Sequence, residues 1–184
     1  MALLLSLSQQ QGIKRISPNW ANGNKAVGGT TNYEQLAKEI QDYYLADLLG
    51  DAFAYDVTEN PESYVSLLDG AEYTDCDGNT VNQKGLRYCL AFWNYGKYVS
   101  DSMVDDTFTG FVQKNRQETQ TISSGQVQRM QLEANNQAMK AFNQVKKYLD
   151  EMIDSYPLWK CNTSRKPYQP RQINVNKTTY NYGR

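Results

Sequence analysis

The sequence has no histidine among its 184 residues. Histidine is the usual general base near neutral pH and the commonest metal ligand, so its absence excludes Ser/His/Asp catalysis and histidine-based metal centres. Glycine-rich phosphate loops and apolar stretches long enough to cross a membrane are also missing. Residues 3–5 are three leucines, too few for a secretory signal, and we interpret them as a sticky strand or anchor. We therefore expect a protein that is not an enzyme, carries no cofactor or metal, and does not associate with a membrane.

Cysteine is rare as well. Cys76, Cys89 and Cys161 are odd in number and too widely spaced for a metal-binding pattern. This usage is typical of reduced thiols in the cytosol. Cys89 falls on the apolar side of a predicted helix and is expected to be a small buried residue, whereas Cys76 falls in a predicted turn.

Two pairs of carboxylates, Asp75 with Asp77 and Asp105 with Asp106, are the remaining candidates for acid–base chemistry or cation binding. Both pairs lie in segments that we expect to be loops. Aspartate is common in solvated turns, because its side chain accepts hydrogen bonds from the nearby backbone. We favour turns over a reactive site for both pairs.

Acidic and basic residues are unevenly distributed along the chain. Residues 1–33 contain three bases, residues 155–184 contain six, and neither stretch has an acid, whereas residues 34–154 contain all 20 acids against ten bases. The basic ends are poor in apolar side chains, so we expect them to be arms that do not fold alone. The acidic body of a neighbouring copy is a suitable partner for such arms, and solvated tails without a role are the alternative.

Helical periodicity dominates the middle of the chain. A first helix is predicted to begin at Thr31 or Asn32, either of which can cap it, and to be interrupted or ended at Gly50. A short second helix begins at Asn60, which precedes a proline at the first helical position. Asp77 and Gly78 then indicate the turn of a small β-hairpin.

Two longer helices follow. Residues 85–103 form a predicted helix in which Gly96 allows close approach of a neighbouring helix. Residues 105–121 are expected to be polar and extended. Ser123 or Ser124 caps the last helix, whose mid-stripe alanines permit tight packing. The predicted fold is mainly α: an extended arm at 1–32, a domain of about four helices with a short hairpin at 33–156, and a basic extended arm at 157–184.

Five segments of this body, in their order and spacing, carry a resemblance to a known family. They are residues 67–75 (LLDGAEYTD), a glycine-containing turn, residues 84–98 with a tyrosine-rich helix, residues 109–115 (TGFVQKN), and the long last helix. Over roughly residues 33–155 the chain resembles the head-to-tail connector (adaptor, or ring) proteins of tailed bacteriophages, most closely those of crAss-like and other Bacteroidales phages.

The resemblance implies a structural virion protein of the neck or tail, assembled in the host cytoplasm. It implies a ring, commonly of twelve copies, that docks below the portal protein, lines or seals the DNA exit channel, and supports the next tail ring or tail tube protein. The loop before the last helix and the C-terminal arm often contact the portal or a neighbour in such rings. The corresponding interface candidates are Phe111, Val112, Gln113, Lys114, Trp159, Arg165, Lys166, Tyr168, Arg171, Tyr180 and Tyr182.

Two alternatives stay open. Bases and aromatic residues alternate in the C-terminal arm, a composition that suits binding of nucleic acid, including non-specific contact with DNA in a channel. The acidic body argues against tight binding of free DNA, because it repels the phosphate backbone. Another tail-completion or ring protein of similar size is the second alternative.

Overall fold

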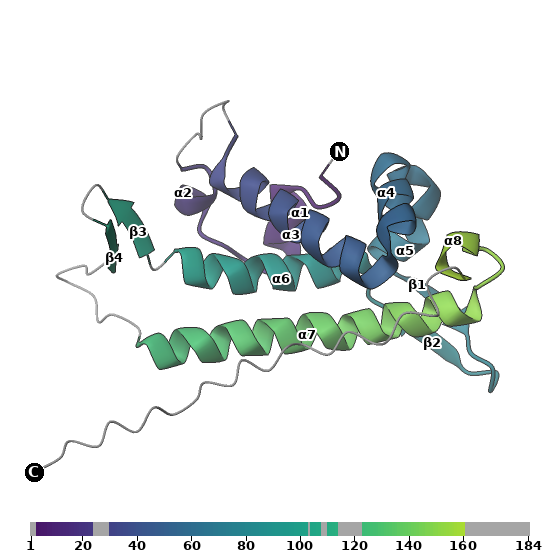
Figure 1. The fold of residues 1–184 in the computed structure, drawn as a ribbon. Coiled ribbons are helices and arrows are strands. Elements are labelled where there is room, and N and C mark those ends of the chain that lie inside the picture. Colours follow the sequence, from purple (N-terminus) through teal and green to yellow (C-terminus); the bar gives the residue numbers. More distant parts are fainter. Residues whose placement is uncertain (1–2, 24–29, 103, 108–109, 114–122, 161–184) are drawn as a thin grey trace, which may run out of the picture.

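The computed structural model describes residues 3–23, 30–102, 104–107, 110–113 and 123–160. They form a mainly helical protein with short antiparallel hairpins, which confirms the predicted fold class (Figure 1). In chain order the elements are α1 (Leu7–Ile13), α2 (Pro18–Ala21), α3 (Asn32–Leu49), α4 (Asp51–Glu59), the 3₁₀ helix η1 (Pro61–Tyr64), α5 (Val65–Asp69), β1 (Ala71–Thr74), β2 (Thr80–Gln83), α6 (Leu86–Asp101), β3 (Val104–Thr107), β4 (Gly110–Gln113), α7 (Ser124–Glu151) and α8 (Pro157–Lys160).

Three helices are stacked at the centre of the molecule, with α6 between α3 and α7 (Figure 1). Trp93 of α6 is buried at this junction. Its ring stacks on Tyr44 of α3, with 4.6 Å between ring centroids, and it also contacts Phe142 of α7 at 6.5 Å. Because α6 is covered from two directions, it buries more of its circumference than an amphipathic surface helix does.

Small residues bring α6 and α7 close together. Ala134, Ala138 and Ala141 of α7 are buried in this contact. A methyl group at Gly96 of α6 would lie 3.5 Å from Cβ of Ala134 and 3.3 Å from Oδ1 of Asn135. Both predictions of tight packing, from Gly96 and from the alanine stripe, are confirmed.

The predicted caps at Thr31 and Ser123 are confirmed, whereas the side chain of Asn60 donates to Asp56 and does not cap η1. The Thr31 hydroxyl accepts a hydrogen bond from the backbone N–H of Glu34, and the Glu34 carboxylate accepts one from the N–H of Thr31. Ser123 and Gln126 make the same reciprocal pair at the start of α7. Each pair satisfies two N–H groups that the first turn of a helix leaves without partners.

Gly50 separates α3 from α4, as the sequence indicates. It has φ of +87°, a conformation that other residues rarely adopt, and the next residue begins α4 in a new direction (Figure 1). Phe53 and Val57 of α4 are buried. The chain thereby folds back, and α4 contacts both α3 and the short helix α8.

The predicted hairpin is present. β1 and β2 pair antiparallel from Ala71 with Gln83 to Thr74 with Thr80, and Gly78 in the turn has φ of +83°. The segment 105–121 was expected to be polar and extended, yet its described part contributes to a second hairpin. β3 and β4 pair there from Val104 with Gln113 to Thr107 with Gly110.

The prediction of an extended N-terminal arm is wrong for residues 3–23. This segment contains α1 and α2, and Leu4 and Leu5 are buried in the main core. Of the two interpretations of the leucine run, a strand or an anchor, the structure supports the anchor. Ile16 and Ala21 form a second, smaller cluster with Tyr33 and Ala37 of α3. The segment is therefore part of the folded body.

Hydrogen bonds to buried backbone explain why so polar a segment can pack there. The N–H of Leu4 donates to Oε1 of Gln41 on α3 at 2.8 Å, and its carbonyl accepts from Nε of Arg87 on α6 at 2.7 Å. The carbonyl of Leu5 accepts from the hydroxyl of Tyr33 at 2.9 Å. Buried backbone groups without partners would oppose this packing, so side chains of the body make it possible.

Candidate functional site

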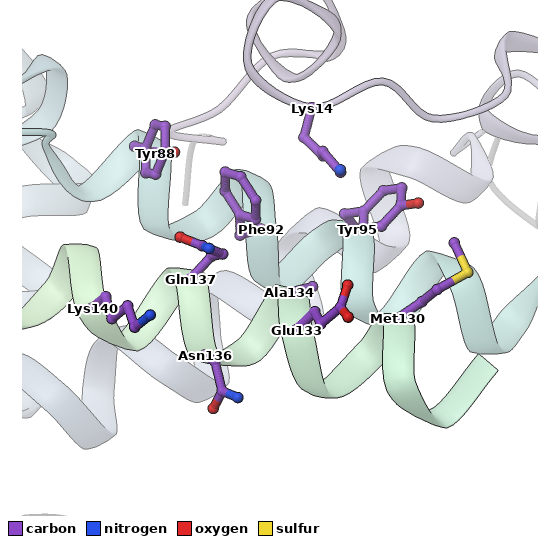
Figure 2. Close-up of a pocket in the computed structure, with 10 residues that line it drawn as sticks. All are labelled: Lys14, Tyr88, Phe92, Tyr95, Met130, Glu133, Ala134, Asn136, Gln137 and Lys140. Atoms are coloured by element: carbon purple, nitrogen blue, oxygen red, sulfur yellow. The ribbon is translucent and has the colours of Figure 1, made fainter. Parts of the chain in front are cut away.

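A surface groove of about 650 Å³ runs between α6 and α7 beneath the end of α1 (Figure 2). Tyr88, Phe92 and Tyr95 recur at helical spacing along one side of α6 and form its aromatic wall. The other lining residues are Lys14, which directly follows α1, and six residues of α7: Met130, Glu133, Ala134, Asn136, Gln137 and Lys140.

Lys14 lies over the aromatic wall. Its Nζ is 4.4 Å from the ring centroid of Tyr95 and 5.7 Å from that of Phe92, in the range of cation–π attraction. Burial, followed by the nearby phenol of Tyr98, raises the pKa of Tyr95, so its hydroxyl stays neutral and can donate a hydrogen bond. The groove offers flat rings, amides and charges of both signs, which suits a partner side chain with an apolar body and a polar end.

A second groove, of about 570 Å³, lies between α3 and α4. Leu45, Ala46, Ala52 and Ala54 contribute apolar surface to it. The carboxylates of Asp42 and Asp51 line the same groove, as do Gln41, Tyr55 and Thr58.

The helices that form this second groove are strongly acidic. α3 and α4 carry seven carboxylates and a single base, Lys38. Tyr43 of α3 is 64% exposed and Tyr55 of α4 is 57% exposed, although a side chain as large as tyrosine is usually more buried. An apolar groove with a carboxylate rim and exposed aromatic rings is suited to a basic, aromatic partner.

The carboxylates of the first hairpin stabilise its turn. Oδ1 of Asp75 accepts hydrogen bonds from the backbone N–H of Asn79 at 2.7 Å and of Asp77 at 3.1 Å. These bonds, with the Asn79 one foremost, lower the pKa of Asp75. The turn interpretation is confirmed for Asp75. For Asp105 and Asp106 the turn interpretation is wrong, because both lie in β3, paired with Val112 and Phe111; their side chains are not described.

The described residues hold no group of three or more His, Cys, Asp or Glu side chains that could bind a metal ion. Cys89 is buried, as predicted, and burial raises the pKa of its thiol, so the thiol stays protonated and unreactive. Cys76 is exposed in the hairpin turn.

Among the described residues that line the two grooves, none is a predicted interface residue. Phe111, Val112 and Gln113 form part of β4, whose side chains are not described. Lys114 and the arm residues Arg165, Lys166, Tyr168, Arg171, Tyr180 and Tyr182 lie outside the described residues.

Trp159 alone among these candidates has a described side chain, and its position differs from the prediction. It is 5% exposed, packs against Phe53, and donates a hydrogen bond from Nε1 to Asp150 at 2.8 Å. An aromatic residue beyond a helix-ending proline looks like an arm residue in sequence. Here Pro157 begins the short α8, which returns Trp159 to α4 inside the same molecule.

Sequence reasoning missed both grooves. The spacing of Tyr88, Phe92 and Tyr95 was an available signal for the first, because it marks a second aromatic side on a helix that already has an apolar one. The surplus of carboxylates in residues 34–59 was the signal for the second. Neither signal reveals that a groove forms, since that depends on how two helices pack.

None of the helices in the described ranges combines the length and the apolar content that crossing a membrane requires. Residues 45–169 match the sequence model of a family of unknown function (DUF6712), a range that runs from the last turn of α3 through α8 into the basic segment that follows. No curated protein and no solved structure matches the chain.

Proposed function

We propose that this chain, which belongs to the family of unknown function DUF6712, is a structural virion protein of a tailed bacteriophage. It forms a ring of identical copies below the portal protein and joins the head to the tail. The ring lines or seals the channel through which DNA leaves, and it supports the next tail ring or the tail tube.

The resemblance to connector proteins supports this proposal, and the fold is compatible with it. The segments that carry the resemblance lie in α5, the first hairpin, α6, the second hairpin and α7. α5, β2 and α7 are joined by contacts that also involve α6, so most of these segments belong to one packed unit.

The observation that carries the proposal is the acidic α3–α4 surface with its open apolar groove and exposed tyrosines. Seven carboxylates beside one base repel one another in the isolated body, although Glu34 caps α3 and Asp56 accepts a hydrogen bond from Tyr64. They become favourable when a basic partner covers them. A head-to-tail ring needs two different, complementary surfaces on each copy, and a chain with an acidic body and basic ends provides such a pair.

The test is the mass of the full chain in solution, alone and mixed with the portal protein of the same phage. We expect a particle of about 250 kDa, twelve times the chain mass of 21.0 kDa, either alone or on the portal. Electron microscopy of the same sample gives the copy number. A stable monomer that ignores the portal would contradict the proposal.

Binding of nucleic acid is a second candidate, favoured by the five bases and three tyrosines of residues 161–184. Titration of single- and double-stranded DNA at several salt concentrations distinguishes it. A steep fall in affinity with salt, together with a monomeric protein, would favour this second function over a ring.

A further inference from the structure

We propose that the groove between α3 and α4 binds residues 161–184, the basic C-terminal segment, of a neighbouring copy of the chain. The inference deepens the proposed function and rests on it in one respect, because it requires that copies meet side by side.

Charge complementarity is the first argument. Residues 161–184 contain five bases and no acid, and α3 with α4 carries seven acids and one base. Elsewhere on the body, α7 is closer to balance, with four bases and three acids. A basic segment is therefore drawn to the α3–α4 surface more strongly than to the α7 surface.

The chemistry of the groove is the second argument. Its apolar surface, from Ala46 and Ala52 above the buried Leu45, accommodates the rings of tyrosines, of which the segment has three. Tyr55 on the groove is more than half exposed and presents a ring on which an arginine guanidinium can stack. Asp42 is exposed on the rim of the groove and is placed to accept hydrogen bonds from the same guanidinium groups.

The length of the segment is the third argument, and it favours a neighbouring copy over the same chain. The segment begins after α8, which packs against α4 (Figure 1). Its 24 residues span up to about 80 Å when extended. The longest helix, α7, has 28 residues and is about 42 Å long. A contact with the adjacent groove of the same chain would use few residues, yet bases and tyrosines continue to the last residue, Arg184.

The first experiment titrates a fluorescent peptide of residues 161–184 into dilute full-length protein and follows anisotropy under reducing conditions. We expect saturable binding that Asp42→Lys weakens at least about fivefold, because a groove carboxylate becomes a like charge. Asp47→Lys is the matched control, since Asp47 is exposed on a different side of α3 and does not line the groove. It makes the same change in net charge and should alter the affinity less than about twofold.

Absence of saturable binding, or equal weakening by Asp42→Lys and Asp47→Lys, would overturn the proposal. If the peptide fails to bind while Asp42→Lys abolishes association with the portal, the groove belongs to the portal and the proposal is equally wrong. Lysine is a better helix former than aspartate, so neither substitution should unfold α3, and circular dichroism checks this.

The second experiment identifies the copy that supplies the segment. A mixture of ¹⁴N- and ¹⁵N-labelled full-length protein is treated with a carbodiimide, which joins carboxylates to lysines in direct contact. We expect links from Asp42 or Asp51 to Lys166 or Lys177 between differently labelled chains. Links within one chain only would show that the segment docks on its own body, against the proposal.

These outcomes are separable from failure of the proposed function. Peptide binding with the expected pattern, in a protein that forms no particle with the portal, would reject the connector role and leave the docking intact. A ring on the portal without peptide binding would support the connector role and reject the docking of residues 161–184 in the groove.

Discussion

The α6–α7 pair and the α3–α4 pair are built on different principles. α6 and α7 meet through glycine and alanine over a long contact, and their surface charges are mixed in sign. α3 and α4 are separated by Gly50, leave an apolar groove between them, and carry seven acids against one base. The interior of the first pair is packed to a density at which little can be changed, and its groove lies at the surface beside Lys14. The second retains exposed apolar surface and repulsion between charges.

The difference indicates where stability and where recognition reside. Tight packing of small residues contributes dispersion and apolar burial within one molecule. The surplus of carboxylates beside exposed tyrosines on α3 and α4 contributes most to stability when a basic partner covers it. The N-terminal segment, residues 3–21, connects the two pairs, since it makes hydrogen bonds to both α3 and α6.

The largest effect is expected where the two pairs are joined. Leu5 is 2% exposed, and Leu5→Ala removes a buried side chain and leaves a cavity, which should cost about 2–5 kcal/mol of unfolding free energy. Urea denaturation followed by circular dichroism measures the loss. Leu132→Ala is the control, because the same truncation at a residue that is 60% exposed should cost under about 0.5 kcal/mol. Equal losses of stability at the two sites would mean that residues 3–21 are not part of the folded core.

How much of this could be read from the sequence depends on the kind of interaction. Local signals identified the capping residues Thr31 and Ser123, the break at Gly50, and the close approach at Gly96. Each of these depends on neighbouring residues in the chain or on a single side chain, so a pattern can reveal it.

The N-terminal segment was misjudged because its packing depends on partners distant in the chain. Gln41 and Arg87 look like surface residues in sequence, yet they bind the backbone of Leu4. Trp159 was misjudged for the same reason, since only the fold reveals that Phe53 and Asp150 receive it. Composition correctly indicated the acidic body but could not locate a groove within it.

The next effect sharpens the account of α6 and α7. Gly96→Leu places a branched side chain where the first carbon already lies within 3.5 Å of Ala134, and should cost about 1–3 kcal/mol through overpacking. Gly125→Leu, in the first turn of α7, meets open space and should be neutral or stabilising by up to about 1 kcal/mol. Thermal unfolding of both variants measures the contrast. A tolerated Gly96→Leu would mean that α6 and α7 are not closely packed.

A smaller effect concerns the α4 side and depends on pH. Burial, together with a hydrogen bond from its hydroxyl to Asp56, raises the pKa of Tyr64 from 10.0 to about 12. The folded protein therefore holds this proton more tightly than the unfolded chain does. The resulting stability is complete below pH 10 and is lost as pH rises from 10 to 12.

Tyr64→Phe tests this contribution, because phenylalanine keeps the ring contact with Phe53 but has no proton to lose. The difference in melting temperature between pH 9 and pH 11.5 should be smaller in the variant than in the parent protein. Other buried tyrosines, Tyr33 and Tyr156 among them, also have raised pKa values, so alkaline destabilisation should be reduced and not abolished. An unchanged pH dependence would contradict the assignment to Tyr64.

The smallest effect tests whether the α6–α7 groove is a stabilising feature or a surface kept for a partner. Lys14→Gln removes the cation over Tyr95 and should cost about 0.5–1 kcal/mol, the strength of an exposed cation–π contact. Arg15→Gln, at the exposed neighbouring position, makes the same charge change without a ring beneath it and should cost less. If both variants are as stable as the parent but Lys14→Gln alone impairs assembly on the portal, Lys14 serves a partner. The α6–α7 pair would then combine tight packing with recognition, and the division between the two helix pairs would hold only for the interior.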